Sequence, residues 1–192
     1  VVSIHGDVYK STNGKDFYPI REVNTTRHLV DYQFLAFKRD VNHIWIGGLD
    51  IKNGNYKPKI LFCNGNNEQW TEYVFENESD GSGRAVDVNF PTNQIGYCLI
   101  SGSVNKIYKS TDGGYSWQKL PFEIPIGVRS LAFQDENTGW QSLGKVIYKT
   151  TDGGNTWQKE FEAESDIKKL YYTQNVLYAF AEDGLLYRYY FK

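Results

Sequence analysis

Short apolar runs alternate with polar turns along most of the chain, and no segment keeps the three-to-four-residue spacing of an amphipathic helix. One unit begins with an apolar strand at residues 130–133 and continues, after a polar turn, with strands at 140–143 and 146–149. A fourth strand is predicted from residue 156 to about residue 161, after a turn that contains Asp152, Gly153 and Gly154. The pattern therefore predicts units of four short antiparallel strands and an all-β fold.

This unit repeats along the chain. Residues 107–119 (IYKSTDGGYSWQK) line up without a gap with residues 147–159 (IYKTTDGGNTWQK), and residues 88–100 line up with 131–143. Weaker copies occur at 8–18 and 60–70, and a partial copy at 169–191 lacks the Asp-Gly-Gly turn. Four strands in a repeat of about 40 residues indicate the blades of a β-propeller, because each sheet needs neighbours to bury its two faces.

We expect one propeller domain over residues 1–192, with approximate blades at 1–24, 29–76, 84–123, 128–162 and 166–192. The first unit begins at what should be its second strand, and the last ends after about its third. The five blades are therefore predicted to contain three, four, four, four and three strands, from the first blade to the last. Two arrangements fit that count: a five-bladed ring with incomplete first and last blades, which we favour slightly, and a part of a larger propeller.

The recurring turn has a mechanical explanation. Its aspartate can accept hydrogen bonds from the backbone that follows, and its glycines can take positive φ without steric cost. The tryptophan ring can cover apolar surface under the turn while its indole N–H finds a carbonyl. We therefore assign a structural role to two sets of residues: Ser110, Asp112, Gly114 and Trp117 in one copy, and Thr150, Asp152, Gly154 and Trp157 in the other.

The S/T-x-D-x-G-x-T/S-W pattern of these two turns resembles the Asp-box, or BNR repeat, of sialidases, sortilin-type ectodomains and many secreted propellers. The longer unit, residues 133–143 followed by TTDGGNTWQK, is similar to the repeat of the photosystem II stability and assembly factor family and its bacterial relatives. With the weak copies included, the resemblance covers about four fifths of the chain. It implies a binding or assembly scaffold outside the cytoplasm (periplasmic, cell-surface or secreted), with the boxes on rim loops away from any active site.

Composition narrows the list of partners and cofactors. Lys plus Arg is 21 and Asp plus Glu is 23, a net charge of −2, so no cationic excess is present to bind nucleic acid. No apolar run is long enough for a transmembrane helix. Cys63 and Cys98 lie in apolar strands and are interpreted as two buried thiols in preference to a disulfide. Neither residue belongs to a CxxC or zinc spacing, and we expect no metal and no cofactor.

Candidate functional residues are few. Arg84, Arg129 and Lys168 come immediately before the predicted first strands of three blades, where they could bind a partner on one open face of a propeller or serve as solvated loop charges. Asp87 is interpreted as a hydrogen-bonded buried residue. The aromatic tail at residues 187–191 could stack on a ligand, although packing between blades is the preferred explanation.

We therefore expect a non-catalytic scaffold whose loop face binds a protein partner, with no catalytic residue assigned. The alternative is a carbohydrate-binding or glycoside hydrolase propeller of the sialidase type. That alternative lacks support in the sequence, because the arginine signature of sialidases is missing: Tyr18-Pro19-Ile20-Arg21 has its letters in the wrong order.

Overall fold

The computed structural model describes residues 9–11, 13–16, 18–19, 35–40, 43–52, 55–64, 70–75 and 83–191. All regular structure in these ranges is β-strand, and the strand pairs with known register are antiparallel. None of the described segments forms a helix long and apolar enough to cross a membrane. The all-β prediction is confirmed. The chain divides into two compact units, residues 1–88 and 89–192.

The first unit contains a short hairpin and one four-stranded sheet. The hairpin pairs β1 with β2, and the sheet has the order β3-β4-β5-β6. Its core includes Trp45, Ile60 and Phe62, which are at most 1% exposed. Gly47 on β4 lies so close to β7 that an added Cβ would approach the Ala85 carbonyl oxygen within 2.9 Å. These strands are β1 (Tyr9–Lys10), β2 (Tyr18–Pro19), β3 (Leu35–Asp40), β4 (His43–Lys52), β5 (Asn55–Asn64) and β6 (Trp70–Val74).

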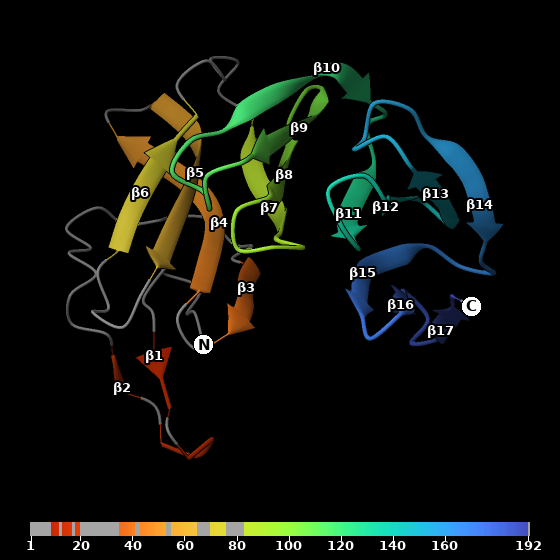
Figure 1. Ribbon diagram of the computed structural model, residues 1–192, viewed down its shortest axis with the longest axis horizontal. Helices are drawn as coiled ribbons and strands as arrows, with labels where there is room; N and C mark the ends of the chain where they lie inside the picture. The colour runs from red at the N-terminus through yellow and green to blue at the C-terminus, as the bar shows by residue number, and fades with distance from the viewer. Residues whose placement is uncertain are drawn as a thin grey trace. The chain divides into compact units, whose positions relative to one another are not determined.

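Two further four-stranded sheets and a three-stranded sheet follow (Figure 1). The boundary between the two units falls within β7. In each sheet the strands are ordered as they occur in the sequence. The strands are β7 (Arg84–Asn89), β8 (Gly96–Ser101), β9 (Asn105–Ser110) and β10 (Gln118–Ile124); β11 (Val128–Phe133), β12 (Gly139–Leu143), β13 (Val146–Thr150) and β14 (Gln158–Glu162); and β15 (Ile167–Thr173), β16 (Val176–Ala181) and β17 (Leu186–Tyr190).

Sheets of the second unit pack through their apolar faces, which explains why each repeat needs a neighbour. Sheet β11–β14 contributes Ala132, Trp140 and Ile147 to a core shared with sheet β15–β17, whose Leu170 and Leu177 are at most 3% exposed. Successive first strands are also joined by hydrogen bonds. The Phe133 N–H donates to Asn89 Oδ1 at 2.9 Å, and the Leu170 N–H donates to Ser130 Oγ at 3.0 Å.

The strand pattern predicted for the third complete repeat agrees closely with the structure. Strands expected at 130–133, 140–143 and 146–149 occur at 128–133, 139–143 and 146–150. The fourth begins at residue 158 rather than 156, because residues 156 and 157 belong to the turn. The blade boundaries and the question of ring closure stay predictions. The Asn-Gly turn predicted after residue 63 and the Phe17 position lie outside the described residues.

Candidate functional site

Two of the three predicted cations lie beside one carboxylate in the second unit. Arg129 is the second residue of β11 and is exposed, and Lys168 is the second residue of β15. Lys168 Nζ lies 2.5 Å from Glu182 Oε1. The pKa of Glu182 is lowered by this hydrogen bond, by the charge of Lys168 and, to a smaller extent, by the charge of Arg129. Arg129 therefore lies close enough to Glu182 to influence it, and it has no ion pair in the described part of the chain.

The sequence prediction for these cations needs one correction. Arg84 is the first residue of β7, and Arg129 and Lys168 are second residues of their strands, so all three lie within strands rather than before them. The strands begin earlier than expected because backbone pairing extends to residues before the predicted starts; Val128, for example, pairs with Leu143. Arg84 is half-buried and belongs to the first unit. The structure thus brings Arg129 and Lys168 together within the second unit, whereas Arg84 belongs to the first unit.

The turn after β9 is held together by the side chains predicted to build it. Ser110 Oγ donates to Asp112 Oδ1 at 2.9 Å and accepts from the Gly114 N–H at 2.8 Å. Ser116 donates to Asp112 through both its N–H and its hydroxyl, at 2.9 and 2.6 Å. Burial alone would raise the pKa of Asp112, but these hydrogen bonds outweigh it and lower the pKa. The Trp117 Nε1–H donates to the Gly114 carbonyl at 3.1 Å.

The turn after β13 repeats this network almost atom for atom. Thr150 Oγ1 donates to Asp152 Oδ1 at 2.7 Å and accepts from the Gly154 N–H at 2.9 Å. The Thr156 N–H and hydroxyl donate to Asp152 at 2.8 and 2.6 Å, and they are the largest causes that lower the pKa of Asp152 to about 2. The Trp157 Nε1–H donates to the Gly154 carbonyl at 3.1 Å. Gly154 and its counterpart Gly114 take positive φ, of 92° and 102°.

Each turn also anchors its sheet to the loop before it. The Gly113 N–H donates to the Gln94 carbonyl at 2.9 Å, and the Gly153 N–H donates to the Asn137 carbonyl at 2.8 Å. Trp157 contacts Phe133 edge-to-face, with ring centroids 6.2 Å apart. Because every carboxylate oxygen of Asp152 accepts a hydrogen bond from within the turn, the arrangement serves folding rather than catalysis.

A degraded third copy follows β1. The Gly14 N–H donates to Ser11 Oγ at 2.8 Å, and the N–H groups of Lys15 and Asp16 both donate to Asn13 Oδ1 at 2.9 Å. Asn13 occupies the position that the aspartate has in the other two turns, and its amide oxygen performs the same function. The turn is thus held by similar side-chain acceptors, with bonds of shorter sequence spacing than those in the other two turns.

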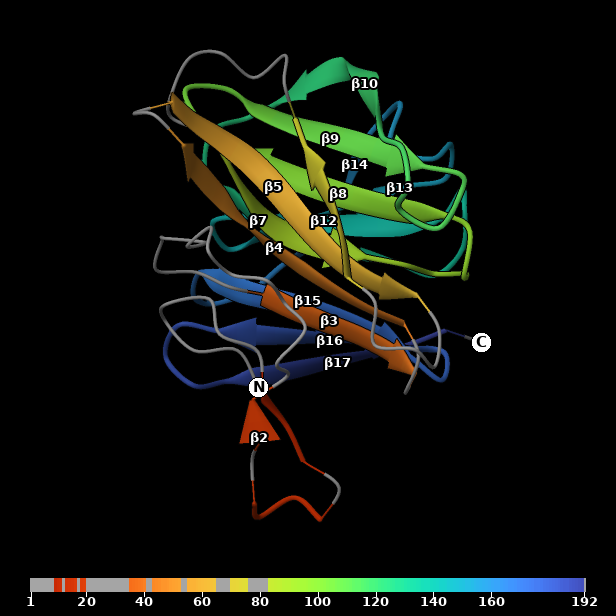
Figure 2. The same ribbon diagram turned by 90° about the vertical axis from the view of Figure 1, so that its left-hand side faces the viewer.

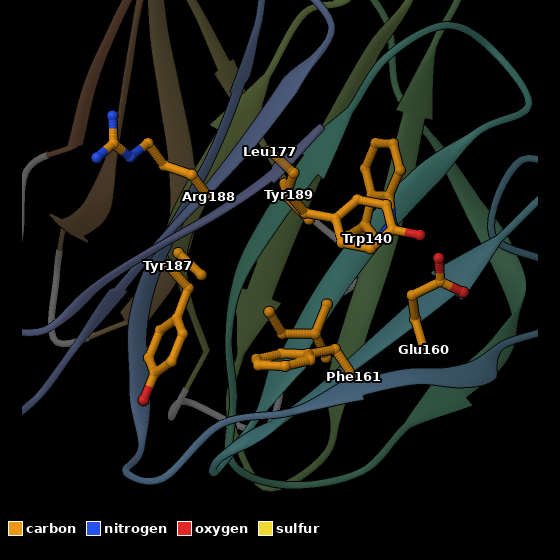
Figure 3. Close-up of a pocket in the computed structure, with 9 residues that line it drawn as sticks. Trp140, Glu160, Phe161, Leu177, Tyr187, Arg188 and Tyr189 are labelled. Atoms are coloured by element: carbon orange, nitrogen blue, oxygen red, sulfur yellow. The ribbon is translucent and has the colours of Figure 1, made fainter. Parts of the chain in front are cut away.

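A pocket of about 200 Å³ lies between sheets β11–β14 and β15–β17 (Figure 3). Its apolar walls include Trp140 and Ile147 from one sheet and Leu177 and Ala179 from the other. Phe161, Tyr187 and Tyr189 line it nearer the outer strands, and Glu160 and Arg188 appear on opposite sides of it in Figure 3. The pocket therefore combines an aromatic interior with one anionic and one cationic side chain.

The polar groups of this pocket are sparse. Lys149 Nζ lies 3.8 Å from Glu160 Oε1 and 5.9 Å from the centre of the Trp140 ring. The indole N–H of Trp140 is buried and has no acceptor among the described residues. Glu160 is the single carboxylate among the residues that line the pocket. Most glycoside hydrolases use a pair of carboxyl groups, of which this pocket supplies one.

The aromatic tail at residues 187–191 contains both packed and exposed side chains. Tyr187 and Phe191 pack against the shared core, which agrees with the preferred explanation. Tyr189 and Tyr190 are instead 47% and 64% exposed. Sequence analysis did not identify Trp140 or Phe161 as pocket residues. Both are aromatic residues near or within predicted strands, but which strands of the next repeat they face is known only once the two sheets are packed.

The remaining candidates are accounted for within their units. Asp87 is 1% exposed, as expected for a buried residue, and it has interactions in the structure. Cys63 and Cys98 are both buried thiols that form no disulfide, as preferred from the sequence. No group of three or more potential metal ligands occurs in the described ranges.

No protein-family model and no curated protein matches the sequence. Among solved structures, YCF48 from Cyanidioschyzon merolae matches with a TM-score of 0.64 and 16% identity, covering 98% of this chain and 65% of that one. YCF48 bound to a D1 peptide matches with a TM-score of 0.56 and 20% identity, covering 83% and 56%. The GH74 enzyme of Niastella koreensis matches with a TM-score of 0.58 and 18% identity, covering 79% and 26%.

The chain thus spans between about a quarter and two thirds of the length of these proteins. The first two likenesses are to a photosystem II assembly factor with a propeller fold and the third is to a propeller enzyme. All three are below 25% identity, so what they share with this chain is architecture. Together with the successive antiparallel sheets of three and four strands, they show that the fold is a β-propeller.

Proposed function

We propose that this chain is a non-catalytic propeller module that binds an acidic segment of a protein partner on the surface formed by Arg129 and Lys168. The observation that carries the proposal is the placement of these two cations on neighbouring first strands, beside one carboxylate. Arg129 is exposed and keeps its donors available, because it has no ion pair in the described ranges. A guanidinium of this kind is suited to bidentate binding of a carboxylate.

The comparisons support a peptide-binding role without supplying a site. One matched structure is described as YCF48 bound to a D1 peptide, so a propeller of this architecture is able to hold a peptide. In keeping with that role, we assign the two Asp-Gly-Gly turns to the Asp-box type, with Asp112 and Asp152 as structural residues. The rigid turns would hold the strands that present the cations, so binding would come from complementarity and not from a reactive group.

The proposal is tested with an array of synthetic peptides of acidic, neutral and basic composition, probed with the labelled 192-residue chain. We expect selective capture of acidic peptides and a decline as salt is added, because exposed charge pairs are screened. The variant Arg129→Glu/Lys168→Glu should lose this capture. Lys119→Glu, on an exposed cation of β10, is the matched control for a change of charge.

A separate Arg84→Glu variant tests the third predicted cation. If Arg129→Glu/Lys168→Glu still captures acidic peptides and its melting temperature is unchanged, the surface formed by these two residues is not the binding site. A glycan array run in parallel addresses the carbohydrate-binding alternative. Reproducible glycan binding together with a blank peptide array would replace the proposal with that alternative.

A further inference from the structure

The turn between β1 and β2 contains an asparagine that is followed by a glycine. Asn13 and Gly14 are exposed, and the turn leads into β2, which is drawn in red in Figure 2. Gly14 has a φ of 72°, and a Cβ added to it would meet nothing within 4 Å. Because glycine has no side chain, its nitrogen attacks the amide of a preceding asparagine with little steric hindrance. The fold leaves this Asn-Gly pair accessible to that reaction.

One hydroxyl contacts both of the groups that would react. Ser11 Oγ accepts from the Gly14 N–H at 2.8 Å and donates to Asn13 Oδ1 at 3.2 Å. A hydroxyl in this position can take the proton from the attacking nitrogen and pass its own proton to the amide oxygen. Ser11 therefore connects the nucleophile and the electrophile of the same ring closure.

The side-chain amide of Asn13 is also polarised by its neighbours. The N–H groups of Lys15 and Asp16 both donate to Asn13 Oδ1 at 2.9 Å, so they would stabilise negative charge that develops on this oxygen. Asn13 Nδ2 donates to Asp16 Oδ2 at 2.7 Å. The carboxylate thus lies beside the nitrogen that would leave as ammonia, where it favours protonation of that nitrogen.

The two stronger turns are not arranged for this reaction. At the position of Asn13 they have Asp112 and Asp152, whose lowered pKa keeps them as carboxylates, and a carboxylate resists attack by a nitrogen. The N–H groups of Gly113 and Gly153 donate to backbone carbonyls at 2.9 and 2.8 Å, and a carbonyl has no proton to pass on. Among these three turns, the first alone combines an amide, a glycine N–H and a hydroxyl that bridges them.

We propose that the turn between β1 and β2 is a self-modifying site at which Asn13 loses ammonia and becomes an acidic residue. The Gly14 nitrogen forms a bond to Cγ of Asn13, while its proton passes to Ser11 Oγ and the Ser11 proton passes to Oδ1. The tetrahedral intermediate returns a proton to Nδ2, the Cγ–Nδ2 bond breaks, and ammonia leaves a cyclic imide. Water then opens the imide at either carbonyl to aspartate or isoaspartate, so one water is consumed and one ammonia is released.

The modification goes beyond the proposed function, because it lies in the first unit and involves neither Arg129 nor Lys168. Opening to aspartate gives this turn the acidic residue that the other two turns have at the same position. It also removes the Nδ2–H that binds Asp16 and adds a negative charge beside that carboxylate. The conversion therefore replaces an attraction within the hairpin by a repulsion.

Mass spectrometry of the aged protein tests the proposal, because it distinguishes the amide from the acid at each asparagine. The 192-residue chain is incubated at neutral pH beside a synthetic peptide of residues 8–19 (VYKSTNGKDFYP). The peptide has the same Asn-Gly pair, and an isolated hairpin is marginally stable at best. We expect Asn13 to be converted roughly tenfold or more faster in the chain than in the peptide, because a positioned proton-transfer group accelerates a reaction by at least this factor.

Variants of Ser11 test the proton relay. Ser11→Ala removes the hydroxyl and should slow the conversion toward the rate of the peptide. Ser11→Thr is the matched control: it keeps a hydroxyl, as Thr150 does in the equivalent turn, and should restore the fast conversion. The same Ser11→Ala change in the synthetic peptide should have little effect, because the peptide does not hold the hydroxyl against the reacting groups.

Two results would overturn the proposal. The first is a conversion of Asn13 that is no faster in the chain than in the peptide, which would mean that the turn does not activate the amide. The second is an equal rate for Ser11→Ala and the wild type, which would exclude the hydroxyl as the relay. Asn53 and Asn64 also precede glycines in the sequence and serve as references in the same samples.

Discussion

The ring of Tyr97 lies flat on the ring of Phe133, with centroids 3.6 Å apart and planes 5° from parallel. Tyr97 is fully buried, and its hydroxyl donates to the Glu136 carbonyl at 2.6 Å. Lys109 Nζ lies 5.6 Å from the centre of the same ring. The next pair of sheets repeats the arrangement, since Trp140 stacks on Tyr172 at 5.5 Å beneath Lys149. An aromatic stack with a lysine above it is therefore the recurring joint between sheets of the second unit.

Removing the Tyr97 hydroxyl tests the polar part of this joint. We expect Tyr97→Phe to lower the free energy of unfolding by about 1 kcal/mol, because the Glu136 carbonyl loses its donor while the stack is kept. Urea unfolding followed by tryptophan fluorescence measures the change. Tyr171→Phe, at a half-exposed position of β15, is the matched control and should be near neutral. Equal stability of Tyr97→Phe and the wild type would show that this hydrogen bond does not stabilise the fold.

The close approach of Phe133 to Gly139 gives a second prediction. A Cβ added at Gly139 would collide with the Phe133 ring, and the same relationship recurs between Gly96 and Phe90. Gly139→Ala should therefore destabilise the chain by about 1 to 3 kcal/mol through overpacking. In the double variant Gly139→Ala/Phe133→Leu, the smaller side chain leaves room for the new methyl group.

A double-mutant cycle separates overpacking from backbone effects. The cost of Gly139→Ala should be smaller in the Phe133→Leu background than in the wild type. Strictly additive changes in unfolding free energy would contradict the steric explanation. The recurrence of this Gly–Phe pair in two sheets also explains why residues 88–100 align with 131–143 in the sequence.

The strands and turns of the second unit could be predicted because their determinants are local. The spacing of apolar residues places β11, β12 and β13 within two residues, and the Asp-Gly-Gly motif predicts its own hydrogen bonds. The sequence predicts the start of β14 two residues too early, because Thr156 and Trp157 have strand propensity but are held in the turn by Asp152 and Gly154. Local side-chain-to-backbone bonds outweigh strand propensity there.

The candidate site was less predictable because it depends on pairing between distant strands. The sequence identified Arg129 and Lys168, but Glu182, which pairs with Lys168, lies in a turn whose position depends on the register of β15 and β16. The pocket likewise combines Trp140 and Phe161 with Tyr189 of the next repeat. No local sequence pattern indicates which faces of two repeats contact each other. These contacts are defined only by the packing of the sheets in the structure.

Truncation of the turn tryptophan should cost more than any surface change in the same loop. Trp157 contacts the Phe133 ring and donates to the Gly154 carbonyl, and Trp117 makes the equivalent bond while 7% exposed. Trp117→Ala should therefore lower the free energy of unfolding by about 3 kcal/mol or more. Tyr115→Ala, at a 54% exposed position of the same turn, is the control. A Trp117→Ala chain as stable as its control would contradict the structural role of the turn.

Acid titration tests the carboxylate of the second turn. Hydrogen bonds from Thr156 and Thr150 lower the pKa of Asp152 from its ordinary value of 3.8 to about 2. A carboxylate with a lowered pKa stabilises the fold above its unfolded-state pKa, and this contribution disappears as pH falls through its folded-state pKa. The free-energy difference between the wild type and Asp152→Asn should therefore be constant above about pH 5 and shrink between about pH 4 and pH 2.

Thr156→Val provides the mechanistic control for this titration, because it removes the hydroxyl donor and leaves the carboxylate in place. Its pH-dependent loss of stability should be smaller than that of the wild type and complete at a higher pH, since the folded-state pKa of Asp152 moves back toward the unfolded value of 3.8. Urea unfolding at a series of pH values measures both variants. Glu162, whose pKa is also lowered to about 2 by Lys145 and Lys159, titrates in the same range and is common to all three chains. Its contribution therefore cancels when the free energies of unfolding of two chains are subtracted. If the wild type is still more stable than Asp152→Asn by the same amount at pH 2, the turn does not depend on the charge of Asp152.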